Sequence, residues 1–498
     1  MRPFVLTIVA GTLMAAGCTL IPQYQRPASP ISNIYPTDGV YGTQPDRGTG
    51  ERGANERAAA DIGWREFFVD PRLRKLVEIA LGNNRDLRVA VLNVDADREQ
   101  YRITRAASFP AIEASAGAHL ERTPEDLSVF GETISKDYTV GLNTSWEIDF
   151  WGRIRSLSGA ALAQYLATAQ ARKSVQVTLV AQVADEYLTL LAYDDLLTVT
   201  KNTLSTAQAS YDLTKLQFDT GVGSELNLRE AQSVVEHARA NLEAQARARA
   251  QAENALVLLI GEPLPDDLPR GLSLDAQALL ADVPPGLPSD LLSGRPDIMA
   301  AEEKLIAANA NIGAARAAFF PRISLTGAFG TASPTLGDLF KAGSAAWSFA
   351  PQVILPIFEG GSNIANLEQA KVLEQIQIAN YEKTIQSAFR EVADGLAARG
   401  TYDKEIAALR HNQDAQQRRF DLAYARYRNG ADSYQSVLTA QNDLYSSEQQ
   451  LVDTRLARWT SIVDLYRALG GGWIEHSGDR PLPPDATTDY AHLTSHAG

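Results

Sequence analysis

Three short patterns in this 498-residue chain resemble sites for chemistry, and each fails on its surroundings. Residues 48–53 (GTGERG) have dinucleotide-loop spacing, but no apolar strand precedes them and no apolar-periodic helix directly follows. Residues 93–97 (NVDAD) begin like a calcium loop, but they lack its glycine and lie in helical sequence. Of the six histidines, only His492 and His496 are four apart, and they lie in a tail that is expected to be disordered. No nucleophile–base pair is found, so we expect no enzyme and no metal site.

The residue best suited to covalent chemistry is the single cysteine, Cys18, which excludes an internal disulfide and a cysteine-based metal site. It follows Arg2 and an apolar run over residues 4–16, too short to span a bilayer, which predicts a signal peptide. The residues AAGC at 15–18 resemble the lipobox of bacterial lipoproteins, which implies S-diacylglycerol and N-acyl (palmitate) lipid on Cys18. Thr19, where inner-membrane lipoproteins carry aspartate, implies the outer membrane. The alternative is a plain signal peptide with a stray cysteine.

Composition limits the remaining function classes. Lys and Arg number 46 against 60 Asp and Glu, giving a formal charge of −14, which disfavours nucleic acid as a partner. No apolar run reaches 18 residues, and the mean hydropathy is −0.18, so the sequence does not predict a helical membrane protein. Alternating strands of a membrane barrel remain compatible with this composition.

The chain repeats itself. RAASFP at 105–110 returns as RAAFFP at 316–321, 211 residues later. The spacing Gly-x-x-Ser at 221–224 returns at 430–433, at an offset of 209. Matches in one order at nearly one offset predict a tandem duplication.

Each copy has the same expected order of elements. A helix is predicted over 73–107 and ends before Pro110. Alternating apolar and polar residues then predict two strands of about 10 residues, the length of a tilted membrane-crossing strand. These strands are expected at 112–120 and 138–148, and again at 323–329 and 347–357. Four strands are too few to close a membrane barrel, so either the sheet is soluble or several chains share one barrel.

Long helical hairpins follow the strands. Residues 156–219 contain no proline, and only Gly159 interrupts a predicted helix of roughly 95 Å. A glycine turn follows, Ser224 is the expected N-cap, and a helix over 225–259 returns. The second copy repeats this with a turn at Gly430, a cap at Ser433 and a helix to Leu469. Such helices must pair as coiled coils. The expected turn glycines are Gly221, Gly223 and Gly430.

These boundaries divide the chain into six parts. We expect a signal peptide at 1–17, a lipid-anchored extended segment at 18–72, repeat 1 at 73–260, a proline-rich connector at 261–296, repeat 2 at 297–473, and a disordered tail at 474–498.

At these residues the chain resembles the outer-membrane factor family, the TolC-like exit ducts, and most closely the OprM-like lipoprotein branch. The resemblance covers nearly the whole chain. It is carried by GLPSDLL at 286–292, RPDI at 295–298, GAARAAFFP at 313–321, EVADGL at 391–396 and ALGGGW at 468–473.

The resemblance implies an α+β membrane protein that forms a homotrimer. Four strands per chain would give a 12-stranded β-barrel, continuous with a 12-helix periplasmic α-barrel. The implied function is the outer-membrane exit channel of a tripartite multidrug efflux system, which confers antibiotic resistance with an RND-type pump and a periplasmic adaptor. It implies no cofactor beyond the lipid. The alternatives are an exit duct for type I protein secretion and a non-channel structural lipoprotein.

In the family, residues after the second hairpin turn line a closed periplasmic aperture. The matching positions here are Gln435, Ser436, Thr439 and Asn442, and the spacing predicts one helix face for Gln435, Thr439 and Asn442. This sequence lacks the family's aspartates at 436, 439 and at Asn227, so a ring of carboxylates is not expected. Tyr427 matches the family's tip tyrosine, and Arg428 and Asp432 remain as further hydrogen-bonding candidates. The alternative is that these are ordinary solvated coiled-coil residues.

Overall fold

The computed structural model of the chain describes residues 19–37, 39–41, 58–122, 124, 134–277, 279 and 288–479. The predicted signal peptide and Cys18 lie outside these residues. The chain forms two compact units, each built from both halves of the sequence. Unit 1 comprises Met1–Ala28, Asn93–Ala169 and Ala300–Glu382; unit 2 comprises Ser29–Leu92, Gln170–Met299 and Lys383–Gly498.

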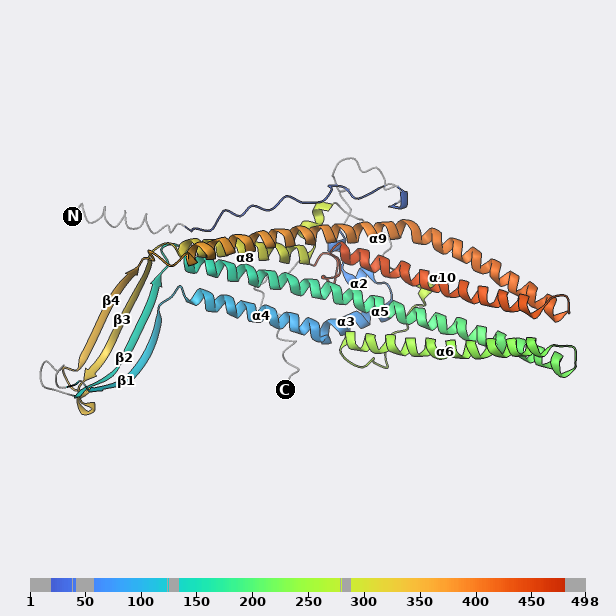
Figure 1. Cartoon of the computed structure of the whole chain (residues 1–498), viewed down its shortest axis with the longest axis horizontal. Coiled ribbons are helices and arrows are strands. Elements are labelled where there is room, and N and C mark those ends of the chain that lie inside the picture. Colours follow the sequence, from blue (N-terminus) through green and yellow to red (C-terminus); the bar gives the residue numbers. More distant parts are fainter. Residues whose placement is uncertain are drawn as a thin grey trace. The chain divides into compact units, whose positions relative to one another are not determined.

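Both halves of the chain contain a helix, two strands and a helical hairpin in that order (Figure 1). The first half has α3 (Pro71–Asn83), α4 (Arg85–Ala106), β1 (Ala111–Arg122), β2 (Ile134–Ile148), α5 (Arg153–Asp219) and α6 (Glu225–Ile260). The second has α8 (Pro296–Ala317), β3 (Arg322–Ser333), β4 (Ala345–Ile354), α9 (Ser362–Arg428) and α10 (Tyr434–Ala468). Short elements complete the described residues: η1 (Gly39–Tyr41), η2 (Ala59–Asp61), α2 (Trp64–Phe67), η4 (Leu274–Ala276), η5 (Pro288–Asp290), α7 (Leu291–Gly294) and η6 (Leu336–Asp338). This arrangement confirms the α+β class.

In unit 1, the strands form one antiparallel sheet in the order β1-β2-β3-β4 (Figure 1). The register pairs Ala114 with Leu142, Leu142 with Phe329, and Phe329 with Trp347, which puts the apolar positions of all four strands on one face. The polar positions therefore share the opposite face. Strand β4 ends at Ile354, three residues before the predicted end, because Pro356 has no N–H to continue the ladder.

The helix predicted over 73–107 is interrupted at Asn84, so one continuous helix was wrong. Asn84 has an extended backbone with ψ of 131°, which ends α3. Its side-chain oxygen accepts from the Leu87 N–H at 2.9 Å and caps α4, while its amide donates to the Leu259 carbonyl at 2.8 Å. Asparagine favours such breaks because its side chain competes for backbone hydrogen bonds. The sequence Gly-Asn-Asn at 82–84 was the available signal.

The core of unit 2 is aromatic where α2 meets the end of α10. The rings of Phe67 and Tyr466 stack with centroids 3.8 Å apart, and the Tyr466 hydroxyl donates to the Ile62 carbonyl at 2.6 Å. Trp64, Phe67 and Phe68 are fully buried. Burial of three large aromatic side chains stabilises this end of the helical hairpin strongly. Among the described residues, no helix has both the length and the apolar content needed to cross a membrane.

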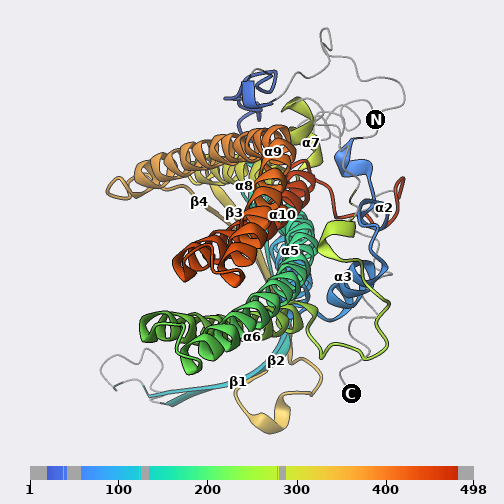
Figure 2. The same cartoon turned by 90° about the vertical axis from the view of Figure 1, so that its right-hand side faces the viewer.

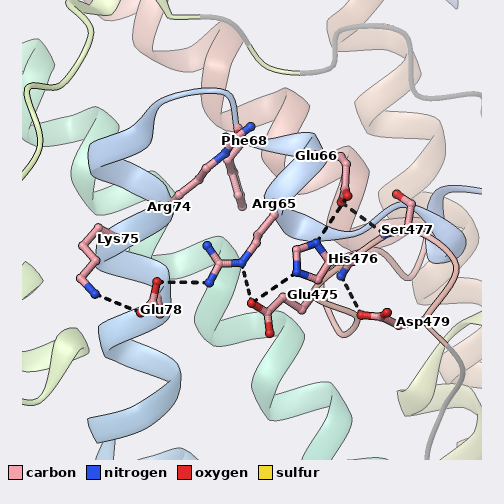
Figure 3. A network of polar contacts seen from close by, with 10 residues as sticks. All are labelled: Arg65, Glu66, Phe68, Arg74, Lys75, Glu78, Glu475, His476, Ser477 and Asp479. Atoms are coloured by element: carbon pink, nitrogen blue, oxygen red, sulfur yellow. Dashed lines mark hydrogen bonds and ion pairs between the residues drawn. The ribbon is translucent and has the colours of Figure 1, made fainter.

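The chain beyond α10 packs on α2 before the description ends at residue 479 (Figure 3). The Trp64 N–H donates to the Ile474 carbonyl at 3.1 Å, and the Arg65 guanidinium pairs with Glu475 at 2.5 Å and Glu78 at 3.1 Å. A Cβ at Gly63 would collide with the backbone of residues 475–476. Residues 474–479 thus lie in an ordered contact that the predicted tail did not anticipate, and 480–498 lie outside the described residues.

Candidate functional site

The candidate residues gather around the two turns that join α5 to α6 and α9 to α10, here termed the tip turns; both belong to unit 2 (Figure 2). Gly221 and Gly430 have φ of +79° and +71°, a conformation that favours glycine. In the first turn the Val222 N–H donates to the Gln217 carbonyl, and in the second the Ala431 N–H donates to Arg426, each at 2.9 Å. Both helices therefore end in the same Schellman motif.

Gly223 serves the first turn in another way. It has no positive φ, but a Cβ there would lie 2.9 Å from the Phe218 nitrogen and 3.0 Å from the Gln217 carbonyl carbon. The close approach of the backbone, not backbone strain, selects glycine at this position.

The two returning helices are capped differently. Ser224 accepts from the Asn227 N–H at 3.2 Å, which is the N-cap predicted for α6. Ser433 holds the equivalent position on α10, but its side chain makes no cap bond, so that prediction was wrong in its chemistry. The preceding residue, Asp432, instead accepts from the Ser433 N–H at 2.8 Å and from the Ser436 hydroxyl at 2.9 Å. These two bonds, followed by that from Arg426, lower the pKa of the Asp432 carboxyl.

Tyr427 links the two hairpins. Its hydroxyl donates to the Gln217 side-chain oxygen at 2.6 Å and lies 3.0 Å from the Thr214 hydroxyl, so it joins the last turns of α9 and α5. The ring is only 5% exposed and packs in a cluster with Tyr434, whose ring centroid lies 5.4 Å away. Burial raises the pKa of Tyr434 to about 12. The link therefore combines a neutral hydrogen bond with a packed aromatic pair.

The partners of Tyr427 escaped sequence reasoning. Gln217 precedes Gly221 by four residues, as Arg426 precedes Gly430, so the repeat offset places Phe218 opposite Tyr427. Phe218 has no hydroxyl and is 39% exposed. Only one of the two equivalent positions can therefore donate a hydrogen bond between hairpins, and Gln217 is its acceptor.

Three of the four aperture candidates line one hollow. Gln435, Ser436 and Thr439 border an open depression of about 880 Å³ between α9 and α10. The α9 wall carries Arg419, which pairs with Asp443 at 2.5 Å, and Arg426, which pairs with Asp432 at 3.2 Å. Thr439 is exposed and turns its hydroxyl back to the Gln435 carbonyl at 2.9 Å.

Asn442 lies in a different depression, although it shares an exposed helix face with Gln435 and Thr439. This second hollow, of about 640 Å³, lies against α5 and α6 and includes Thr200 and Tyr445, whose hydroxyls are 3.1 Å apart. The four candidates thus border two different hollows beside α10.

The other two candidates are less engaged. Asn227 is half-buried, and its backbone N–H donates to the Ser224 hydroxyl in the cap of α6. Arg428 is exposed and forms no ion pair within the described part of the chain. At the tip turns, the carboxylate of Asp432 is bonded to Ser433, Ser436 and Arg426 of its own chain. Positions 436 and 439 carry uncharged side chains. Within residues 19–479, as far as they are described, no three His, Cys, Asp or Glu side chains gather as a metal site.

Comparison with known proteins covers both halves of the chain. The sequence profile of the family described as outer membrane efflux protein matches residues 76–262 and 287–471. The probable efflux pump outer membrane protein TtgC of Pseudomonas putida is 47% identical, over 96% of this chain and 97% of that protein. The solvent efflux pump outer membrane protein SrpC of the same species is 48% identical, over 93% and 97%. The open state of the MtrE outer membrane channel of Neisseria gonorrhoeae superposes with a TM-score of 0.81 at 40% identity, covering 93% of this chain and all of that one.

Proposed function

This chain belongs to the outer membrane efflux protein family, and from that membership we propose that it is the outer-membrane exit duct of a tripartite efflux system. The duct is a passive, water-filled conduit. An energised inner-membrane pump of the RND type and a periplasmic adaptor supply its cargo. The family's work is transport, so no catalytic residue is assigned.

The observation that carries this proposal is the sheet of unit 1. Its apolar face is uncovered: Trp347 and Phe349 are 78% and 63% exposed in the single chain. Exposed apolar area of this kind is typical of a surface that contacts lipid or a partner. The opposite face carries polar residues such as Glu113, Ser115 and Asn143. A sheet that is apolar on one face and polar on the other suits a wall between lipid and water.

The sheet also has two open edges, on β1 and β4. Unpaired backbone N–H and C=O groups cost several kcal/mol each in hydrocarbon, about 2–7 per group, so one chain cannot insert alone. Four strands per chain and three chains would close a barrel of twelve. The two hairpins contribute four helices per chain, and three chains would supply a tunnel of twelve.

The cargo follows from the relatives. SrpC is named for solvent efflux, and two further relatives from Pseudomonas putida, at 47% and 48% identity, are named for toluene efflux. We therefore assign small apolar and amphiphilic compounds, antibiotics among them, as the exported class.

Three finer features belong to the same proposal. Tandem duplication accounts for the repeated motifs, with copies at 73–260 and 297–473, and is supported by the two separate stretches of the family match. The residues around the tip turns form the periplasmic aperture, held closed by Tyr427 and lined by Gln435, Ser436 and Thr439. Cys18 carries the lipid, which is an auxiliary tether to the outer membrane.

Deletion and complementation test the function. Removal of the gene should increase susceptibility to apolar antibiotics and solvents, and a plasmid copy should restore resistance. If only the secretion of a protein toxin or protease is lost, the chain serves protein export. If neither changes, the structural-lipoprotein alternative stands.

A further inference from the structure

We propose that residues Leu20–Arg26, the N-terminal strap, close the seam between α5 and α8 and thereby fix the lipid-bearing end of the chain at the C-terminal end of α8. The strap and its docking surface lie wholly in unit 1. The inference about the lipid depends on the proposed function, whereas docking of the strap does not.

The strap is held along α8 by polar contacts at a regular spacing. The Arg26 guanidinium pairs with both carboxylate oxygens of Glu302 at 2.7 Å. Asn309 donates to the Pro22 carbonyl at 2.9 Å, and Arg316 to the Leu20 carbonyl at 3.2 Å. These three α8 residues are seven apart, so they lie on one face of the helix.

The order of these contacts means that the strap runs antiparallel to α8 (Figure 1). An extended chain from Leu20 to Arg26 covers about 20 Å, at about 3.4 Å per residue. Helix α8 from Glu302 to Arg316 rises about 21 Å, at about 1.5 Å per residue. The two lengths agree, so the extended strap spans the whole distance between its first and last contacts on α8.

The seam between α5 and α8 is built to receive one strap side chain. Ile21 packs against Ala160 and Ala163 of α5 and against Ala307 and Ala310 of α8. Its Cγ1 would lie 2.5 Å from a Cβ at Gly313, four residues before the end of α8. Glycine is unfavourable within a helix, but here the absence of a side chain leaves the space that Ile21 occupies. Five small residues thus leave a gap that Ile21 closes.

The residue expected to carry the lipid is close in sequence to the docked strap. Only Thr19 separates Cys18 from the first docked residue, Leu20. The lipid-bearing residue therefore reaches at most about 7 Å beyond Leu20. Because Leu20 is bonded to Arg316 one residue before α8 ends, the point of lipid attachment is confined to the junction between α8 and β3.

Chymotrypsin cleavage after Tyr24 tests the docking, with the purified full-length assembly in detergent. The Tyr24 hydroxyl contacts Glu302 at 3.1 Å, so a docked strap shields this bond from cleavage. The variants are Ile21→Ala, which empties the seam, and Arg26→Ala, which removes the paired cation. Gln23→Ala, at an exposed position on the same strap, is the matched control.

We expect Ile21→Ala and Arg26→Ala to be cut about tenfold faster than the parent, and Gln23→Ala to be cut at the parental rate. Ile21→Ala should also lower the temperature at which the assembly dissociates. Equal cleavage of parent and variants would overturn docking. Faster cleavage of Ile21→Ala without a change in dissociation temperature would overturn the proposal that Ile21 closes the seam. The antibiotic susceptibility of cells carrying each variant separates the two proposals. If the strap of the parent is cut as fast as those of the variants while cells carrying the parent stay resistant, the strap proposal fails and the proposed function stands.

Discussion

The Tyr427 hydroxyl donates a 2.6 Å hydrogen bond to the Gln217 side chain, 210 residues away in the sequence. The two residues end the outgoing helices of the two hairpins, so this bond and the packed Tyr427–Tyr434 pair join the hairpins at their tips. No charge takes part in this link. We therefore propose that packing and neutral hydrogen bonds, rather than charges, hold the aperture closed.

Loss of one hydroxyl should loosen the tip. Tyr427→Phe keeps the packed ring but leaves the Gln217 oxygen without its donor, at a cost of about 1–2 kcal/mol. We expect higher single-channel conductance and greater susceptibility to a large antibiotic that the parent excludes. Tyr424→Phe, one turn earlier on α9, is the control, because its ring stacks on Phe420 and its hydroxyl forms no hydrogen bond with any residue that the structure describes. Equal effects of both variants would remove the special role of Tyr427.

A carboxylate ring can be built at the proposed aperture. Thr439→Asp adds three charges per trimer near the axis, whose mutual repulsion is on the order of several kcal/mol before screening. We expect stronger cation selectivity and a new block by trivalent cations from the periplasmic side, whereas the parent is blocked poorly. Reversal potentials at low salt measure this, with Thr439→Asn as the uncharged control. If Thr439→Asp behaves like the parent, Thr439 does not face the lumen.

Asp185 on α5 predicts a pH-dependent stability. Burial, and then the charge of Asp464, raise its pKa to about 7 against the opposing effect of Arg467, and its Oδ1 has no hydrogen-bond partner within the described residues. Between pH 4 and 7 the folded protein therefore binds more protons at this site than the unfolded chain, so stability falls as pH rises.

Asp185→Asn should remove that loss. We expect the dissociation temperature of the assembly to rise at pH 8, by the equivalent of about 1–3 kcal/mol, and to be unchanged at pH 4. Asp414→Asn alters an exposed carboxylate and should have no effect at either pH. A gain of equal size at pH 4 and pH 8 would show that the buried charge is not the cause.

Lipid on Cys18 should be separable from assembly. Mass spectrometry of the mature N-terminus should find an acylated Cys18. With an alternative signal peptide, Cys18→Ser should still form trimers, because strand pairing and helix packing hold the assembly together. An unmodified N-terminus at another residue would end the lipoprotein interpretation.

Periodic features were predictable from the sequence, whereas local competition between polar groups was not. The alternation at 138–148 predicts β2 because side chains of a strand alternate between its two faces. The glycines at 221 and 430 predict the turns because their backbone conformation requires them. The cap at Ser433 failed because Asp432, one residue earlier, competes for the polar groups around it, binding the Ser433 N–H and the Ser436 hydroxyl.

Long-range pairings were also out of reach. Gln217 and Glu302 belong to no motif, and their importance depends on Tyr427 and Arg26, which only the fold brings close. The strap has no periodicity, since an extended segment that binds one helix needs only a few correctly spaced contacts. Gly313 begins the family-like stretch at 313–321, but the reason for a glycine there is visible only with Ile21 in place.

Planar-bilayer recording of the purified assembly tests the central claim most directly. A species with the mass of three chains should form a channel of low conductance that rises in Tyr427→Phe. Trimers that stay electrically silent in both forms, or a monodisperse monomer that conducts, would contradict the account.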